Sequence, residues 1–312
     1  MDLREDDFKR TAHAPAKLNL FLDVLGRRGD GFHDLETMMV PIRLADQVSF
    51  TPTPKEAHGH AGRILFDVRT CWPVRSPPQP PEIPAGSDNL IVNALELFRR
   101  RSGCSRGAHV QLVKRIPWGA GMGGGSSDAA AALKLANRGW HIDWSDERLS
   151  ALAAEVGSDV PFFLSHSPAI CRGRGERVER LPLLPTLYFV VVKPPAALRT
   201  NDVYRSHDSM AGSKPITARG SLDRLKTSLS HGDWCNLGRW MQNRLQAAAS
   251  LLSPCVDELR RTFAELDFVG HQLTGSGSAY FGVCRHAQHA RRLATILRTR
   301  QLGLVYATRS CQ

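Results

Sequence analysis

The sequence predicts a mixed α+β fold, and three observations support this prediction. Segments with the two-residue apolar alternation of strands, such as residues 12–25, share the chain with runs of strong helix formers, such as Ala129–Leu135. A glycine-rich loop joins a strand to a helix at residues 117–126. The strand before this loop, residues 109–116, carries Gln111 and Lys114 among its apolar residues, so we expect it to be half exposed. A doubly wound parallel sheet has a nearly all-apolar strand at that point.

The other elements follow from the same patterns along the chain. Strands are expected at residues 12–25, 35–51, 109–116 and 187–193, and helices at 90–101, 127–137, 146–156, 236–252 and 285–299. Six prolines between Arg69 and Ser87 exclude a regular element there, so we expect residues 70–86 to form an inserted surface loop. At 312 residues, the chain is long enough for one large domain or two ordinary ones.

Composition favours a cytoplasmic protein with small anionic partners. The formal net charge is +11, which attracts nucleic acid or phosphorylated metabolites. The arginine clusters are not interleaved with aromatic residues as in single-strand binders, so no nucleic-acid partner is expected. Seven cysteines without a C-x-x-C pair disfavour a disulfide framework or a zinc site. The acidic N-terminus is unlike a signal peptide, and no apolar run is long enough for a membrane span.

The glycine-rich loop predicts a phosphate site. Five glycines lie between Gly119 and Gly125, and Ser126, Ser127 and Asp128 follow as natural first-turn residues of a helix. The exposed N–H groups and the dipole of such a helix start bind anions. No lysine follows the last glycine, so the loop is not a Walker A loop, and its match to G-x-G-x-x-G is weak. The alternative is a hairpin turn without a ligand.

Taken alone, the other polar candidates have ordinary structural explanations. A lysine in a strand, such as Lys17, is usually solvated, and Phe32 and His33 could belong to a plain hairpin turn. Asn89 is placed to cap the helix at 90–101, and Asp159 could cap a turn. No cluster of carboxylates identifies a metal site in the sequence.

Three segments nevertheless resemble, in the right order, the signatures of the GHMP kinases. Pro117–Ser127 resembles the ATP loop of this superfamily, Gly157–Pro161 its Gly-x-Asp-Val-Pro segment, and Leu273–Phe281 its third glycine-rich turn. The resemblance covers roughly residues 12–284. It implies a two-domain α+β fold, with an N-terminal ATP-binding domain like the second domain of ribosomal protein S5 (1–168) and a ferredoxin-like C-terminal domain (169–312). The active site would lie in the cleft between them.

Two further segments narrow the resemblance to the diphosphocytidyl-methylerythritol kinases. These are Ala14-Pro-Ala-Lys-Leu-Asn19 and Arg28-Gly-Asp-Gly-Phe-His33. The implied reaction is ATP-dependent phosphorylation of the 2-hydroxyl of 4-diphosphocytidyl-2-C-methyl-D-erythritol in the non-mevalonate (MEP) isoprenoid pathway. ATP and Mg²⁺ are the implied cofactors, with no Mg²⁺ ligand identified. The alternatives are another GHMP small-molecule kinase and a catalytically silent binding protein, and a monomer or weak homodimer is expected.

The resemblance also implies residue roles. Lys17 and Asp159 would be catalytic, with Asp159 as the general base. Asn19, Phe32, His33, Thr200 and Tyr204 would bind the substrate, with Phe32 and Tyr204 stacking on either side of the cytosine and His33 bonding its edge. The ATP site would comprise Asn89 and the loop residues Pro117, Trp118, Gly119, Ala120, Gly121, Met122, Gly123, Gly124, Gly125, Ser126 and Ser127.

Overall fold

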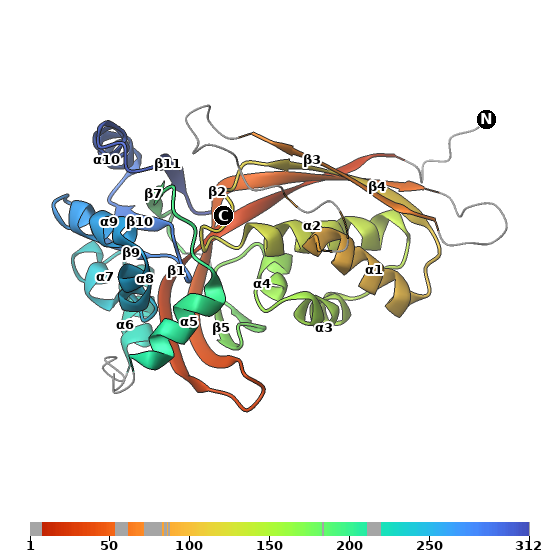
Figure 1. Cartoon of the computed structure of the whole chain (residues 1–312), viewed down its shortest axis with the longest axis horizontal. Coiled ribbons are helices and arrows are strands. Elements are labelled where there is room, and N and C mark those ends of the chain that lie inside the picture. Colours follow the sequence, from red (N-terminus) through yellow and green to blue (C-terminus); the bar gives the residue numbers. More distant parts are fainter. Residues whose placement is uncertain are drawn as a thin grey trace.

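Two β-sheets and the helices that cover them make up the part of the protein that the structure describes (Figure 1). The computed structural model describes residues 8–53, 62–71, 83, 86, 88–182, 184–210 and 220–311. Most of the proline-rich segment 70–86 and of the N-terminal arm lies outside these residues, so the prediction of an inserted loop is not addressed by the structure. No helix within these ranges has the length and apolar character needed to cross a membrane.

The larger sheet is built on a long antiparallel hairpin. Strand β1 (Arg10–Arg27) pairs with β2 (His33–Thr53) along nearly its whole length. One half of β2 pairs with β4 (Gly107–Lys114), which in turn pairs with the edge strand β3 (Ile64–Thr70). The other half pairs with β5 (Ala169–Gly173), and β5 with β6 (Arg177–Arg180). The short strand β8 (Gln242–Asn243) adds to β1 in parallel.

Four helices cover one face of this sheet (Figure 1). They are α1 (Leu90–Ser102), α2 (Gly124–Gly139), α3 (Asp146–Val156) and α4 (Val160–Ser165). The alanine run of α2 is buried against the inward-facing residues of β1, β2 and β4, because small side chains let a helix approach a sheet closely. β4 alternates as predicted at Val110, Gln111 and Leu112, whereas Lys114, which was expected on the exposed side, is buried.

The smaller sheet has the ferredoxin-like strand order. Its strands are β7 (Tyr188–Lys193), β9 (Gly270–Leu273), β10 (Tyr280–Cys284) and β11 (Leu304–Arg309). They lie in the antiparallel order β11-β7-β10-β9, which is 4-1-3-2 in chain order. The helices of this half are α5 (Thr200–Ser209), α6 (Ser221–Ser230), α7 (Trp234–Trp240), α8 (Gln246–Leu252), α9 (Pro254–Ala264) and α10 (Ala287–Thr299). The predicted two-part α+β fold is confirmed.

The two halves share a core because both faces of β7 are buried. Val190 and Val192 point toward α8, α9 and α10, whereas Phe189 and Val191 pack against the hairpin of the larger sheet. This explains why residues 187–192 form an unbroken apolar run, as expected for a strand covered on both sides. β1 is also buried on both faces from Ala14 to Val24, so its polar side chains must find partners within the protein or face a cavity.

Two element predictions were wrong. The helix predicted at 236–252 is broken into α7 and α8, because Gln242 and Asn243 pair with β1 instead. Asn243 also donates from Nδ2 to the carbonyl oxygens of Leu273 and Gly275, both at 2.8 Å. Helix α2 begins at Gly124, three residues before the predicted start at Ser127. The predicted domain boundary at 168 stays a prediction, and β5 and β6 beyond it belong to the larger sheet.

Candidate active site

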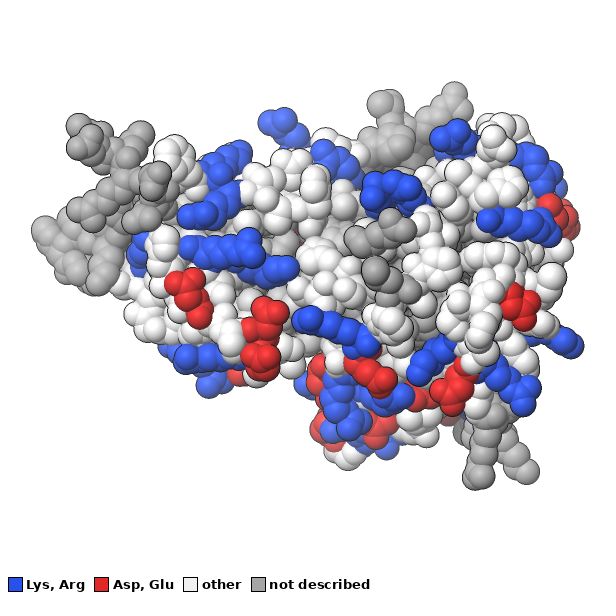
Figure 2. Space-filling model, turned by 180° about the vertical axis from the view of Figure 1, so that it is seen from behind, with Lys and Arg blue, Asp and Glu red and all other residues white. Residues whose placement is uncertain are grey.

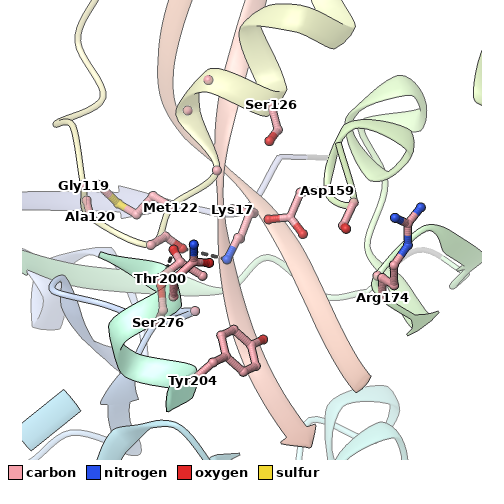
Figure 3. A pocket seen from close by; sticks show the side chains of 18 of the residues that line it. Lys17, Gly119, Ala120, Met122, Ser126, Asp159, Arg174, Thr200, Tyr204 and Ser276 are labelled. Atoms are coloured by element: carbon pink, nitrogen blue, oxygen red, sulfur yellow. Dashed lines mark hydrogen bonds between the residues drawn. The ribbon is translucent and has the colours of Figure 1, made fainter. Parts of the chain in front are cut away.

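One large cavity collects almost all of the predicted site residues. Its volume is about 1260 Å³, and both halves of the chain line it. The predicted residues on its wall are Lys17, Asn19, Phe32, His33, Asn89, Pro117, Trp118, Gly119, Ala120, Gly121, Met122, Gly123, Gly124, Gly125, Ser126, Asp159, Thr200 and Tyr204. Ser127 is the exception, since it is buried and absent from the wall. Figure 3 shows how side chains from β1, the glycine loop, α4, α5 and the 274–278 turn meet in this cavity.

The glycine loop leaves the first N–H groups of α2 free. Gly123 is the N-cap residue with φ +69°, and it provides no side-chain cap. The first α-helical turn closes with the N–H of Ser127 on the carbonyl of Gly123, at 2.9 Å. Within the described ranges, the N–H groups of Gly124, Gly125 and Ser126 have no acceptor, and all three residues line the cavity. These groups and the helix dipole are suited to bind an anion, and anion binding at this loop stays a prediction.

The loop is held in place by a second glycine-rich turn. The N–H groups of Ser278 and Ala279 donate to the carbonyls of Gly119 and Ala120, at 3.3 and 3.2 Å. Gly121 has φ +71°, and a Cβ built there would lie 2.2 Å from the carbonyl oxygen of Thr274. Only glycine allows the two turns to approach this closely. The third predicted signature therefore supports the loop from behind.

Lys17 is buried, contrary to the usual placement of a lysine in a strand. Lys17 is only 3% exposed. Its Nζ donates to Asn19 Oδ1 at 2.5 Å and to the Gly121 carbonyl at 2.6 Å. Burial lowers the pKa of the Lys17 ammonium, and the charges of Asp159 and Cys171 act in the opposite direction. An ammonium has three donors, so one remains for a ligand in the cavity.

Asn19 is held on both sides of its amide group. Its Nδ2 donates to Thr37 Oγ1 at 2.8 Å, and its Oδ1 accepts from Thr274 Oγ1 at 3.2 Å. The Asn19 Oδ1 that accepts the hydrogen bond from Lys17 is therefore fixed by a hydrogen-bond network that joins β1, β2 and the 274–278 turn. This network places the ammonium without a carboxylate partner in direct contact.

Asp159 lies across the cavity from Lys17 (Figure 3). It occupies the N-cap position of α4, but its carboxylate makes no cap hydrogen bond. None of the described residues donates a side-chain hydrogen bond to this carboxylate either, so the turn-capping explanation does not account for it. The structure therefore leaves a half-buried carboxylate free to accept a proton or a hydrogen bond from a ligand.

Phe32 lies at the other end of the cavity, where the β1–β2 hairpin turns. It is 49% exposed, and the Arg174 guanidinium carbon lies 4.9 Å from the centre of its ring. An exposed aromatic ring on a cavity wall offers a stacking surface, and the arginine adds a positive charge beside it. Arg174 was not predicted as a site residue, although its position between the positive-φ residues Gly173 and Gly175 marks a tight turn.

His33 is fixed by two residues of α5. Its Nε2 lies 2.8 Å from Asp208 Oδ1, and its ring stacks on Tyr204 with centroids 4.8 Å apart and planes 24° apart. Tyr204 thus contacts the imidazole, whereas the resemblance implied that it stacks on the substrate's base. Burial, together with the Asp159 charge, raises the pKa of the Tyr204 hydroxyl, which therefore stays protonated at neutral pH.

Thr200 and Asn89 have clear structural contacts. Thr200 Oγ1 lies 3.0 Å from Ser276 Oγ, which ties the start of α5 to the 274–278 turn. Asn89 caps α1, since its Oδ1 accepts from the N–H of Ile91 at 2.9 Å. The capping role expected for Asn89 is confirmed, and its contact with a nucleotide stays a prediction.

A buried charge cluster lies beside the glycine loop, with Lys114 and Asp128 on the cavity wall, and it was missed in the sequence. Lys114 Nζ donates to Asp46 and, at 2.8 Å, to Asp128 Oδ2. Asp46 Oδ1 also accepts from the N–H of Ile116 at 2.8 Å, whereas Asp128 Oδ1 has no partner among the described residues. Burial raises the pKa of Asp128 to about 8, with Lys114 acting against it. The signal was present, because Lys114 continues the inward positions of Val110 and Leu112 in β4.

The cavity has no preformed metal site in the part of the chain that the structure describes. No group of three or more His, Cys, Asp or Glu side chains there could hold a metal ion.

The surface is basic but mixed, since Lys and Arg side chains lie among Asp and Glu side chains on the face shown in Figure 2.

Comparison with known proteins gives matches to both halves. The model of the GHMP kinases N terminal domain matches residues 89–167, and that of the GHMP kinases C terminal domain matches residues 225–301. The chain is 38% identical to the 4-diphosphocytidyl-2-C-methyl-D-erythritol kinase of Pelotomaculum thermopropionicum, over 91% of this chain and 92% of the relative. It is 36% identical to the kinase of the same name from Symbiobacterium thermophilum, over 91% and 93%.

Solved structures show the same relationship. A crystal structure of 4-(cytidine 5'-diphospho)-2C-methyl-D-erythritol kinase superimposes with a TM-score of 0.77 at 33% identity, covering 97% of this chain and 100% of that one. Homoserine kinase from Cytophaga hutchinsonii superimposes with a TM-score of 0.73 over 98% and 95% of the chains, but its 18% identity indicates a common fold alone. Because relatives more than 30% identical match nine tenths of its length, the chain belongs to the 4-diphosphocytidyl-2-C-methyl-D-erythritol kinase family of GHMP kinases.

Proposed function

We propose that the chain is an ATP-dependent kinase that phosphorylates the 2-hydroxyl of 4-diphosphocytidyl-2-C-methyl-D-erythritol. One observation carries the proposal. The free N–H groups of α2, the Lys17 and Asp159 side chains, and the Phe32 and His33 side chains all line a single cavity. A phosphate site, a candidate base and a nucleobase site are the three parts that this reaction needs. The names of the relatives support the choice of substrate.

The phosphates of ATP would bind at the start of α2. The N–H groups of Gly124, Gly125 and Ser126 point a positive dipole end at the cavity, which stabilises the negative charge of the phosphates. Trp118 and Asn89 line the same region and are candidates to contact the nucleoside part of ATP. Mg²⁺ would arrive with ATP and would neutralise part of the negative charge of the phosphates.

Lys17 and Asp159 would perform the transfer. As the substrate oxygen forms its bond to the γ-phosphorus, the Asp159 carboxylate accepts the hydroxyl proton. The bond from that phosphorus to the oxygen bridging to the β-phosphate breaks at the same time, and ADP leaves with the electron pair. The free donor of the Lys17 ammonium stabilises charge on the transferred group.

The substrate's cytidyl end would bind at the turn of the β1–β2 hairpin. Phe32 offers a stacking surface, which gives roughly 1–3 kcal/mol for a base, and His33 can bond the base edge. Asn19, Thr200 and Tyr204 line the wall between the two ends, where the methylerythritol and diphosphate groups would lie. A cytoplasmic location, a place in the non-mevalonate pathway and a monomeric or weakly dimeric state belong to the same proposal.

The test is ADP release by the purified chain with MgATP and each of four alcohols: the cytidyl substrate, mevalonate, homoserine and galactose. We expect turnover with the cytidyl substrate alone. The variant Asp159→Asn should lower kcat by about 10²- to 10⁴-fold, the usual contribution of a general base. Asp146→Asn is the matched control, because it makes the same change at an exposed residue of α3 outside the cavity.

Other outcomes would refute parts of the proposal. Turnover with mevalonate, homoserine or galactose would keep the kinase and refute the substrate. A fully active Asp159→Asn variant would refute the assigned base. No turnover with any alcohol, from a folded chain that binds ATP, would favour a silent binding protein.

A further inference from the structure

We propose that Asp208 is a positioning residue that fixes the tautomer of His33 and thereby makes the site select cytosine over uracil. The inference rests on the proposed function, because it assumes that His33 faces the base of the substrate. It concerns a residue that the sequence did not identify, at the last turn of α5.

The first step is the identity of the proton on His33. An ionised carboxylate can only accept hydrogen bonds, so the 2.8 Å contact between His33 Nε2 and Asp208 Oδ1 requires a proton on Nε2. In the neutral imidazole, the other nitrogen then has no proton and acts as an acceptor. None of the described residues forms a hydrogen bond with Nδ1, and His33 lines the cavity. Nδ1 is therefore an acceptor available to a ligand.

The second step is that the ring cannot turn freely. Tyr204 stacks on one face of the imidazole at 4.8 Å, and Asp208 holds its edge. The two residues are four apart on α5, so they lie on the same side of the helix, one turn from each other. The His33 side chain is only 10% exposed, whereas that of Asp208 is 35% exposed. One helix thus fixes both the plane and the proton of the imidazole.

The third step is the chemistry of the base. Cytosine carries an amino group at the position where uracil carries a carbonyl oxygen. An acceptor at Nδ1 can take a hydrogen bond from the amino group of cytosine. With uracil, the lone pair of Nδ1 faces a lone pair of the carbonyl oxygen, and no proton lies between them. Without Asp208, the ring is free to move its proton to Nδ1, and it can then donate to uracil. Asp208 therefore determines which of the two bases His33 accepts.

The experiment compares kcat/KM for the cytidyl substrate and its uridyl analogue. Wild type should prefer the cytidyl substrate, and Asp208→Ala should lower the ratio of the two values by about tenfold, within the range expected for one base contact. The change should appear mainly in KM. Asp202→Ala, which removes the same charge from the exposed first turn of α5, should leave the ratio unchanged. Asp208→Asn keeps an oxygen that can accept the Nε2 proton, so it should retain more of the ratio than Asp208→Ala.

Two further readouts do not depend on turnover. Two-bond ¹H–¹⁵N spectra should show the Nε2–H tautomer of His33 in wild type and a mixture in Asp208→Ala, with the resonance assigned by its loss in His33→Gln. Calorimetry should show that CDP binds more tightly than UDP in wild type, with a smaller difference in Asp208→Ala. If wild type phosphorylates no cytidyl substrate, the proposed function fails while these two readouts still decide the role of Asp208. An equal loss for both bases, or an Nδ1–H tautomer in wild type, would overturn the inference.

Discussion

Replacing Lys114 should destabilise the protein more than replacing an exposed lysine does. Its Nζ is the cation shared by two buried carboxylates, Asp46 and Asp128, whose side chains are 0% and 4% exposed. Removing one partner of a buried ion pair typically costs about 3–5 kcal/mol, because the remaining charge is left without compensation. Here Asp46 keeps two backbone donors, and the raised pKa of Asp128 lets that group take a proton. Both features reduce the loss, so Lys114→Met should cost about 3 kcal/mol.

Urea unfolding measures this loss. With a slope of about 3 kcal/mol per molar urea, the midpoint of Lys114→Met should fall by about 1 M. Lys9→Met is the matched control, because Lys9 is exposed and, among the described residues, bonds only Gln111. Its effect should lie within about 0.5 kcal/mol. The double variant Lys114→Met/Asp128→Leu removes one of the stranded carboxylates and should recover part of the stability.

Two results would refute this reasoning. If Lys114→Met unfolds at the same urea concentration as Lys9→Met, the cluster does not contribute as the structure indicates. If the double variant is no more stable than Lys114→Met, the loss does not come from leaving the Asp128 carboxyl group buried without its Lys114 partner.

Three other perturbations have defined outcomes. The pKa of Asp128 is raised from 3.8 to about 8 in the folded protein, so between pH 3.8 and 8 the native state holds a proton that the unfolded state has lost. The free energy of unfolding therefore falls as the pH rises through this window. Asp128→Asn should remove that fall in urea midpoints measured from pH 5 to 8, and an unchanged slope would contradict it. Gly121→Ala should lower kcat/KM at least tenfold, whereas Gly103→Ala, with the same φ of +71° but open space for a Cβ, should cost only about 1–2 kcal/mol of stability and no activity. Arg174→Ala uncovers Phe32 and should raise KM for the cytidyl substrate severalfold with little change in kcat, so an unaltered KM would exclude a role for this cation in binding.

Local patterns predicted the elements that local forces determine. The alternation of β4 and the apolar run of β7 gave the strands, and the Asn89 cap gave the start of α1. The glycine loop predicted the exposed N–H groups at the start of α2, since positive-φ glycines before an alanine helix are a short-range signal. The side chains on the cavity wall were predicted from the family resemblance and not from local patterns. Nothing near Lys17 or Asp159 in the sequence distinguishes them from a solvated lysine and a turn aspartate.

Contacts between distant segments could not be predicted in this way. Residues 236–252 have the composition of one helix, yet pairing of Gln242 and Asn243 with β1 breaks it. The partner of His33 lies 175 residues away, and that of Lys114 in β2 lies 68 residues away. Each of these contacts depends on which strands and helices become neighbours, and neither spacing nor composition contains that information.

The β1–β2 hairpin has a consequence for the kinds of alcohol that the cavity can accept. Lys17 and Asn19 lie in β1, and Phe32 and His33 lie at its turn and at the start of β2, so one continuous ribbon of backbone hydrogen bonds carries both ends of the proposed substrate site. The spacing between Lys17, which would contact the transferred group, and the stacking surface of Phe32 is therefore set within a single element. A nucleotide-linked alcohol with one phosphate fewer would seat its base correctly and hold its hydroxyl short of the γ-phosphate. Selection for the length of the linker is thus a property of the hairpin itself.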